Sequence, residues 1–151
     1  MNKQIIKMKK RVFVALLVFL SFISQAQDWQ TDFNTAKEIA SAKNQKIILV
    51  FQGSDWCAPC IKLDRKIWSS EIFKSYAKNN FVLLKADFPR RKKNKLSKKQ
   101  TVQNGLLAEK YNPKGHFPLV LVLDSKGNTL GTTSYKKNMS PQKYIDLLNS
   151  F

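Results

Sequence analysis

The sequence predicts an α/β fold in which a mixed β-sheet lies between two layers of helices. Three observations lead to this prediction. The continuous apolar run 47–51 is typical of a central strand covered on both faces. Segments with helical spacing of apolar residues alternate with short strand-like segments along the chain. Turn-forming residues at 124–128 join the last two strand-like segments, which indicates an antiparallel hairpin.

The first helix and the first strand follow from clear patterns. Residues 32–43 carry apolar side chains at helical spacing, and Thr31 or Asp32 can cap the start of this helix. Residues 46–52 contain the apolar run, and Gly53 begins the break that ends the strand. We therefore expect a helix that leads directly into a buried strand.

Two helices and a second strand are expected next. One helix begins at about residue 57, with Pro59 in its first turn, where the missing N–H costs least. A further helix is expected over residues 69–78. Residues 81–87 are predicted to form the second strand, which Pro89 ends. A strand that returns through helices can pair in parallel with the first strand.

The second half of the chain is expected to close the sheet with a hairpin and a final helix. The basic stretch after the second strand is predicted to be a loop, and Leu106 and Leu107 are predicted to face the core from the helix that follows. The expected elements are a helix over 101–111, strands over 119–123 and 129–134, and a last helix capped by Ser140 with Pro141 in its first position.

Residues 1–26 predict a cleaved secretory signal peptide. Five basic residues occur within residues 1–11, an almost wholly apolar run covers 12–23, and Ser24 and Ala26 supply small residues where signal peptidase reads them. An uncleaved anchor is the alternative, but the run is shorter than the roughly 20 residues of a spanning helix. The mature domain is therefore expected over residues 27–151, in the periplasm or outside the cell.

The chain is strongly basic. Its formal net charge is +17, and loss of the five basic leader residues would leave about +12. Much of this charge lies in residues 90–99, RRKKNKLSKK. Such a run can bind nucleic acid, an anionic membrane or an acidic partner, or it can be a solvated loop. Export and the lack of an interleaved aromatic residue argue against nucleic acid, so no nucleic-acid partner is expected.

The two cysteines of the chain, Cys57 and Cys60, fall at the predicted strand-to-helix junction. A dithiol there can close into a disulfide and reopen by exchange with another protein. A structural disulfide is the alternative, but a bridge across two residues closes almost no loop and gains little stability. A structural zinc site needs four ligands, and the chain has one histidine, so no metal is expected.

These residues together resemble the thioredoxin-like family. The resemblance rests on residues 56–60, WCAPC, after a buried strand, on Phe117 and Pro118 before a late strand, and on the closing hairpin and helix. The approach FQGSDWC at 51–57 is similar to an exported bacterial branch of the family. The resemblance covers essentially all of residues 27–151. It implies a thioredoxin-like three-layer sandwich, a mixed central sheet with helices on both faces.

The family and the position at a helix start imply roles for the cysteines. Cys57 is the expected nucleophile, because backbone N–H groups at a helix N-terminus stabilise a thiolate. Cys60 lies one turn further in, and we expect it to be more buried and to act as the resolving thiol. Ala58 and Pro59, between the cysteines, are expected to tune the reduction potential. No organic cofactor is expected, because the redox-active pair supplies the chemistry.

Four further residues are expected to contact the substrate. Trp56 is predicted to cover the disulfide, with ordinary packing as the alternative. In the family a cis-proline faces the dithiol, which implies this role for Pro118 and a backbone contact to substrate for Phe117; a trans proline at an edge strand is the alternative. His116 could stabilise the Cys57 thiolate or shuttle a proton, or it could be an exposed loop residue.

The sequence departs from the family pattern at the group that accepts a proton. Many members carry a buried acid in the strand before the cysteines, thought to help deprotonate the inner one. The corresponding residues here, Val50, Phe51 and Gln52, include no acid. Asp55 is closer to the cysteines, but we expect it on an exposed loop. The proton acceptor for Cys60 is therefore left unassigned.

We expect a thiol–disulfide oxidoreductase that exchanges disulfides with exported proteins, as a reductant rather than an oxidant. It is expected to be a monomer that draws electrons from a membrane-bound partner. Two alternatives stay open. One is a non-catalytic client-binding or chaperone module. The other is a dedicated thiol reductase for cytochrome maturation, in which the basic stretch 90–99 would be a docking arm.

Overall fold

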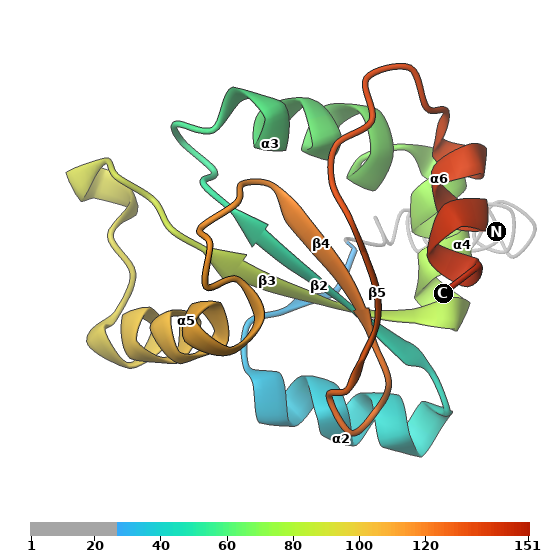
Figure 1. The fold of residues 1–151 in the computed structure, drawn as a ribbon, viewed down its shortest axis with the longest axis horizontal. Coiled ribbons are helices and arrows are strands. Elements are labelled where there is room, and N and C mark those ends of the chain that lie inside the picture. Colours follow the sequence, from blue (N-terminus) through green and yellow to red (C-terminus); the bar gives the residue numbers. More distant parts are fainter. Residues whose placement is uncertain (1–26) are drawn as a thin grey trace, which may run out of the picture.

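The computed structural model describes residues 27–151, so the predicted signal peptide 1–26 lies outside the described residues. Within this part, a five-stranded sheet in the order β1-β3-β2-β4-β5 is covered by helices on both faces (Figure 1), which confirms the predicted sandwich. The elements are β1 (Trp29–Gln30), α2 (Phe33–Lys43), β2 (Lys46–Gln52), α3 (Ala58–Leu63), the π-helical η1 (Asp64–Trp68), α4 (Glu71–Asn80), β3 (Phe81–Asp87), the 3₁₀-helical η2 (Lys92–Asn94), α5 (Lys98–Tyr111), β4 (Leu119–Leu123), β5 (Thr129–Thr133) and α6 (Pro141–Asn149).

The strand directions bring three chain segments to one end of the sheet. β2 and β3 pair in parallel along their whole length, so Gln52 lies opposite Asp87 where both strands end. β4 runs antiparallel to β2 and pairs Leu119 with Phe51, so β4 begins where β2 ends. The segments after β2 and β3 and the segment before β4 therefore lie close together.

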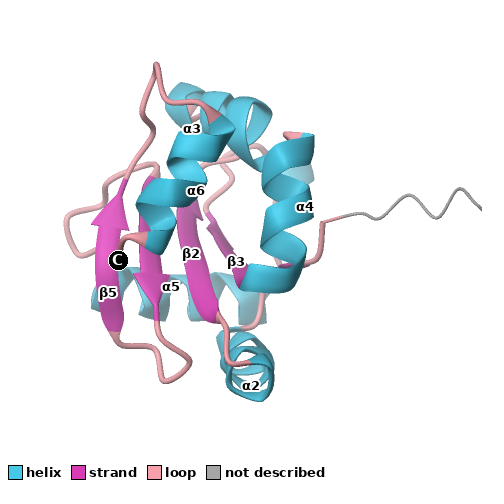
Figure 2. Cartoon of the chain, turned by 90° about the vertical axis from the view of Figure 1, so that its right-hand side faces the viewer, coloured by secondary structure: helices cyan, strands magenta, loops and turns pink. Residues whose placement is uncertain are grey.

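The sheet separates two apolar cores, which explains the continuous apolar run in β2. Ile48 and Val50 pack under α3, η1, α4 and α6, whereas Ile47, Leu49 and Phe51 pack toward α2 and α5, as expected for side chains that alternate along a strand. All five are 0% exposed. Figure 2 shows α3, α4 and α6 on one side of the sheet, with α5 behind the strands.

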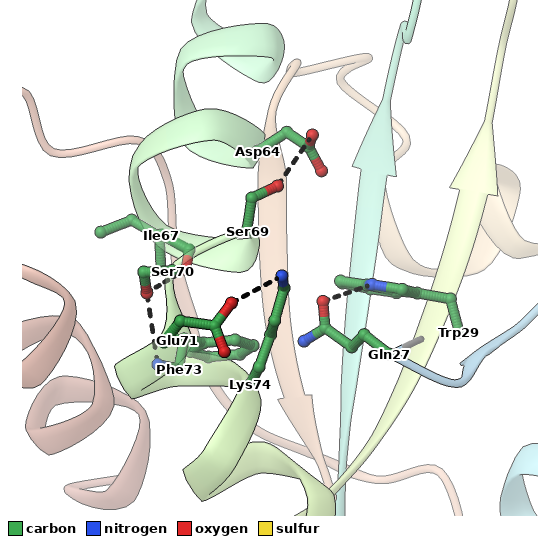
Figure 3. Close-up of polar contacts among 9 residues, drawn as sticks. All are labelled: Gln27, Trp29, Asp64, Ile67, Ser69, Ser70, Glu71, Phe73 and Lys74. Atoms are coloured by element: carbon green, nitrogen blue, oxygen red, sulfur yellow. Dashed lines mark hydrogen bonds and ion pairs between the residues drawn. The ribbon is translucent and has the colours of Figure 1, made fainter. Parts of the chain in front are cut away.

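Polar contacts join the end of η1, which continues α3, to the start of α4 (Figure 3). Ser70 is the N-cap of α4: its Oγ accepts a hydrogen bond from the Phe73 N–H at 3.2 Å and donates one to the Ile67 carbonyl at 2.7 Å. Glu71 in the first turn pairs with Lys74 at 3.1 Å. A serine N-cap is worth about 1 kcal/mol, which explains why the helix restarts here as predicted.

The structure differs from the sequence prediction in three places. The strand β1 was not predicted, because two residues carry no periodic signal. α5 begins at Lys98, where Ser97 caps it by accepting a hydrogen bond from Gln100, so the basic stretch 90–99 is not entirely a loop. The prediction that Leu106 faces the core is wrong: it is 60% exposed and Leu107 is 5% exposed, since neighbouring residues point about 100° apart around a helix.

Candidate active site

The two cysteines lie where β2 gives way to α3, and they are joined in a disulfide. The Cys57 N–H donates to the Gly53 carbonyl at 2.9 Å and closes the turn after β2. Cys57 is the N-cap of α3, and its Sγ accepts a hydrogen bond from the Cys60 N–H at 3.3 Å. α3 continues directly into η1. The Cys57 sulfur therefore faces the unpaired N–H groups and the positive end of this helix.

The prediction that Cys60 is the more buried cysteine is wrong, because each cysteine is 4% exposed. The disulfide bonds the two sulfur atoms directly to each other. What distinguishes the cysteines is their position, with Cys57 at the cap and Cys60 inside the first turn. Ala58 and Pro59, between them, are exposed.

Trp56 is half-buried and packs against two other loops at this end of the sheet. Its Nε1 donates a hydrogen bond to the Phe88 carbonyl at 2.7 Å. Its ring meets the edge of the Phe117 ring at a centroid distance of 5.5 Å, and Phe117 meets Phe88 at the same distance. Gly53 lies against the indole, so closely that a Cβ there would overlap the ring. The structure thus brings together two predicted substrate-contact residues, Trp56 and Phe117.

The Phe117–Pro118 peptide bond is cis, as the family resemblance implied. Pro118 is buried, and the next residue, Leu119, pairs with Phe51. The cis bond therefore lies at the end of the sheet that carries the dithiol. The Pro118 carbonyl accepts a hydrogen bond from Ser134 Oγ at 2.7 Å, which ties this loop to the segment after β5.

His116 is exposed, and its backbone rather than its ring is held in place. Asn112 accepts from the His116 N–H at 2.9 Å and donates to its carbonyl at 2.8 Å. Within residues 27–151, the imidazole forms no hydrogen bond or ion pair. The structure gives this ring no link to either cysteine.

Sequence reasoning missed the role of Asp55, which was expected on an exposed loop. Its carboxylate accepts hydrogen bonds from the Arg90 N–H at 2.9 Å, the Arg91 N–H at 3.0 Å and Asn94 Nδ2 at 2.9 Å. These contacts, the Arg90 N–H first among them, lower the pKa of Asp55 to about 2. The Arg90 guanidinium lies 3.8 Å from the centroid of the Trp56 ring. The sequence did contain a signal for this contact: an acidic residue next to the cysteines, and a basic run later in the chain with which it could pair.

The end of β3 supports the turn from the other side. The Asp87 carboxylate accepts from the Ser54 N–H at 2.9 Å and from Ser54 Oγ at 2.6 Å. The buried Asn104 donates to the Asp87 carbonyl at 2.8 Å. The Phe88 N–H donates to the Gln52 carbonyl at 2.9 Å. The loop that leads to the cysteines is therefore held at two points. Ser54 in the loop bonds to Asp87, and Asp55 in the loop accepts bonds from residues 90–94.

Two further observations concern the described chain as a whole. Between residues 27 and 151, no group of three or more histidine, cysteine or acidic side chains is placed to hold a metal ion. No helix in the same part of the chain is both long and apolar enough to cross a bilayer.

Comparison with known proteins identifies the family. Residues 28–125 match the family model described as thioredoxin-like. The chain is 32% identical over 108 residues to the disulfide bond reductase DsbH of Chlamydia pneumoniae, which is 72% of this chain and 63% of that protein. The thioredoxin-related protein DsbJ of the same organism is 25% identical over 60 residues, 40% of this chain and 17% of its own length. The match thus spans less than two thirds of either relative.

Solved structures with this fold include two close matches. A DsbH oxidoreductase superposes with a TM-score of 0.75 at 26% identity and covers 86% of this chain and 87% of that one. A thioredoxin from Thermus thermophilus superposes with a TM-score of 0.62 at 15% identity, over 83% of this chain and 87% of that one, which shows a shared fold. With the family model matched over most of residues 27–151, this chain belongs to the thioredoxin-like family.

Proposed function

We propose that this chain is a thiol–disulfide oxidoreductase that reduces disulfides in other proteins. The observation that carries the proposal is the Cys57–Cys60 disulfide at the start of α3. A bridge across two residues has little structural value, whereas its place at a helix start favours thiolate chemistry. The reductant direction is supported by the similarity to a protein named disulfide bond reductase.

The proposed reaction transfers two electrons from the protein dithiol to the substrate. The Cys57 thiolate attacks one sulfur of a substrate disulfide, and the other substrate sulfur leaves as a thiolate that takes up a proton. Cys60 then loses its proton and attacks Cys57 Sγ, which forms the Cys57–Cys60 disulfide and releases the second substrate thiol. The oxidised protein needs a separate dithiol or electron donor to begin another cycle.

Cys57 is proposed as the attacking thiol because of its hydrogen bond. The Cys60 N–H that donates to its Sγ at 3.3 Å would also stabilise a thiolate at this atom, and the helix dipole acts in the same direction. Cys60 is proposed to resolve the mixed disulfide. Ala58 and Pro59 are proposed to tune the potential through their effect on this helix turn.

The substrate is proposed to bind across the loop of the cis peptide bond. Phe117 and Pro118 stand at the sheet end that carries the cysteines, and Trp56 contacts Phe117. We assign Trp56, Phe117 and Pro118 to the substrate surface. His116 directly precedes Phe117 in the sequence and is exposed. We assign it only to the edge of this surface.

The proposed setting lies outside the cytoplasm, with exported proteins as substrates. The support is residues 1–26, whose basic start, apolar run and small residues are typical of a signal peptide. In that setting a membrane-bound donor would return electrons to a monomeric protein, and no metal or organic cofactor would take part. The mass of the protein recovered from the cell envelope tests the cleavage, because removal of the leader leaves a chain that starts near Gln27.

A peptide disulfide and two cysteine variants test the activity. Reduced wild-type protein should reduce the peptide and form the Cys57–Cys60 disulfide in equal amount. Cys60→Ser should stop at a mixed disulfide that survives on a non-reducing gel, whereas Cys57→Ser should form none. A Cys57→Ser variant with unchanged protection of unfolded clients, together with no reduction by the wild type, would contradict the proposal and favour a chaperone.

A further inference from the structure

We propose that residues 90–95, the basic ledge, bind acidic side chains that flank the disulfide of a substrate protein. This inference rests on the proposed thiol–disulfide exchange and names the class of protein that the same site selects. The ledge has the sequence RRKKNK and joins the end of β3 to α5. Figure 1 shows it projecting at the end of the sheet where α3 begins.

The ledge is fastened to the turn that carries the cysteines. Asp55, two residues before Cys57, accepts hydrogen bonds from the backbone N–H groups of Arg90 and Arg91 and from the Asn94 amide, all between 2.9 and 3.0 Å. Three hydrogen bonds to one carboxylate tie residues 90–94 to the turn. The ledge therefore has a fixed position relative to the dithiol.

The ledge also has an internal shape. The Asn94 N–H donates to the Arg91 carbonyl at 2.9 Å, and the Lys95 N–H donates to the Lys92 carbonyl at 3.2 Å, which forms the turn η2. The Arg90 guanidinium lies over the ring of Trp56, 3.8 Å from its centroid. Its side chain is thus part of the packing at the site, and the backbone of the lysines that follow is set by the turn.

The charges of the ledge are available to a partner. Lys92, Lys93 and Lys95 are exposed, and none of them forms an ion pair with a carboxylate of the described residues 27–151. Asp55 is occupied by its hydrogen bonds to backbone N–H groups and an amide. Unpaired cations of one sign beside a reactive site attract an opposite charge on the incoming molecule.

An acidic protein segment fits this surface better than nucleic acid or a membrane. Stacking of bases requires an open aromatic face, and Trp56, the ring that Arg90 of the ledge contacts, has Arg90 over its face and Phe117 beside it. A basic segment alone attracts anionic lipids weakly and reversibly, and stable binding in a membrane surface also needs large apolar side chains beside the basic ones. The ledge contains none, and the next residue, Leu96, is half-buried.

The test compares two synthetic peptides that differ only beside one disulfide. One carries Asp and Glu next to its cysteines, and the other carries Asn and Gln. Reduced wild-type protein at low ionic strength should reduce the acidic peptide about fivefold faster. This factor corresponds to about 1 kcal/mol, the sum for two charge pairs roughly 8 Å apart across water. The preference should vanish near 1 M salt, where the screening length is about 3 Å.

Three variants locate the effect. Lys92→Glu with Lys93→Glu should remove the preference or reverse it. Lys43→Glu with Lys126→Glu makes the same change in net charge at exposed positions on the opposite end of the sheet and should keep the preference. Asp55→Ala removes a negative charge, so a general charge effect would strengthen the preference, whereas release of the ledge should weaken it.

The outcomes separate this inference from the proposed function. If wild-type protein reduces neither peptide while dithiothreitol reduces both, the proposed function fails. If it reduces both at equal rates, the function stands and the inference is overturned. Equal rates together with binding to phosphatidylserine vesicles through Lys92 and Lys93 would assign the ledge to a membrane surface, and the same result with single-stranded DNA would assign it to nucleic acid.

Discussion

Replacing Gly53 with alanine tests how tightly Trp56 is held over the turn that leads to the cysteines. A Cβ at position 53 would overlap Cε2, Nε1 and Cζ2 of the indole. The ring cannot move aside freely, because its Nε1 donates to the Phe88 carbonyl at 2.7 Å and its two neighbours Phe117 and Arg90 lie at 5.5 and 3.8 Å. The substitution should therefore displace Trp56 and break these contacts.

The cost follows from the contacts that would be lost. The hydrogen bond is worth about 1 kcal/mol, the cation–π contact about 0.5–1 kcal/mol, and the edge-to-face pair about 0.5–1.5 kcal/mol. Alanine restricts the unfolded chain and returns about 0.4–1 kcal/mol. We expect a net loss of about 2 kcal/mol in the free energy of unfolding.

Urea denaturation of the oxidised protein measures this loss. With a slope of about 1–3 kcal/mol per M, the midpoint should fall by about 1 M for Gly53→Ala. The matched control is Gly105→Ala, where an added Cβ meets nothing within 4 Å in helix α5. That variant should gain about 0.5–1 kcal/mol, because alanine is favoured over glycine inside a helix.

Two results would refute the reasoning about Gly53. The first is a midpoint for Gly53→Ala equal to that of the wild type. The second is an equal loss in a Trp56→Ala background, where the overlap no longer exists and the cost should largely disappear. Either result would mean that the indole is not fixed where the structure has it.

Three more predictions concern the residues around the site. The pKa of the Asp55 carboxyl should be about 2 when measured by carbon NMR, chiefly because of the hydrogen bond from the Arg90 N–H. Because the folded pKa lies below the ordinary value of 3.8, the contribution of Asp55 to stability is complete above pH 3.8 and is lost as the pH falls through about 2. A midpoint near 3.8 would contradict these contacts. Asn104→Ala should lower the free energy of unfolding by about 1–3 kcal/mol in urea, because the Asp87 carbonyl loses its 2.8 Å donor; a loss below about 0.5 kcal/mol would count against it. Ser134→Ala should cost about 1 kcal/mol in the same assay, through the bond to the carbonyl of the cis-proline, and no change would show that this bond is not needed.

Much of the fold could be predicted because its signals are local. The apolar run in β2 indicates burial on both faces, and Asp32 and Ser140 cap helices as their positions indicated. The strand β1 has only two residues, too few for a periodic pattern of apolar side chains to show in the sequence. The prediction that both Leu106 and Leu107 face the core was wrong for Leu106, because adjacent residues point about 100° apart around a helix and α5 packs on the sheet through Leu107.

The site was predictable in its reactive residues and less so in its surroundings. Cys57 and Cys60 share a motif, and the cis bond before Pro118 followed from the family resemblance. The bond from Arg90 to Asp55 joins residues 35 positions apart, and such a contact leaves no periodic trace in a sequence. The equal burial of the two cysteines is a property of the folded chain, which no local pattern encodes.

The reduction potential of the Cys57–Cys60 pair decides whether this dithiol can reduce disulfides in other proteins. Equilibration of the protein in dithiothreitol or glutathione buffers of known potential, with free thiols counted by alkylation and mass, gives this value. A reductase should have a potential near −270 mV, about the value of reducing thioredoxins. A value near about −120 mV would identify an oxidant, and a value well below about −300 mV would identify a structural disulfide. Either of these would contradict the proposed reductase.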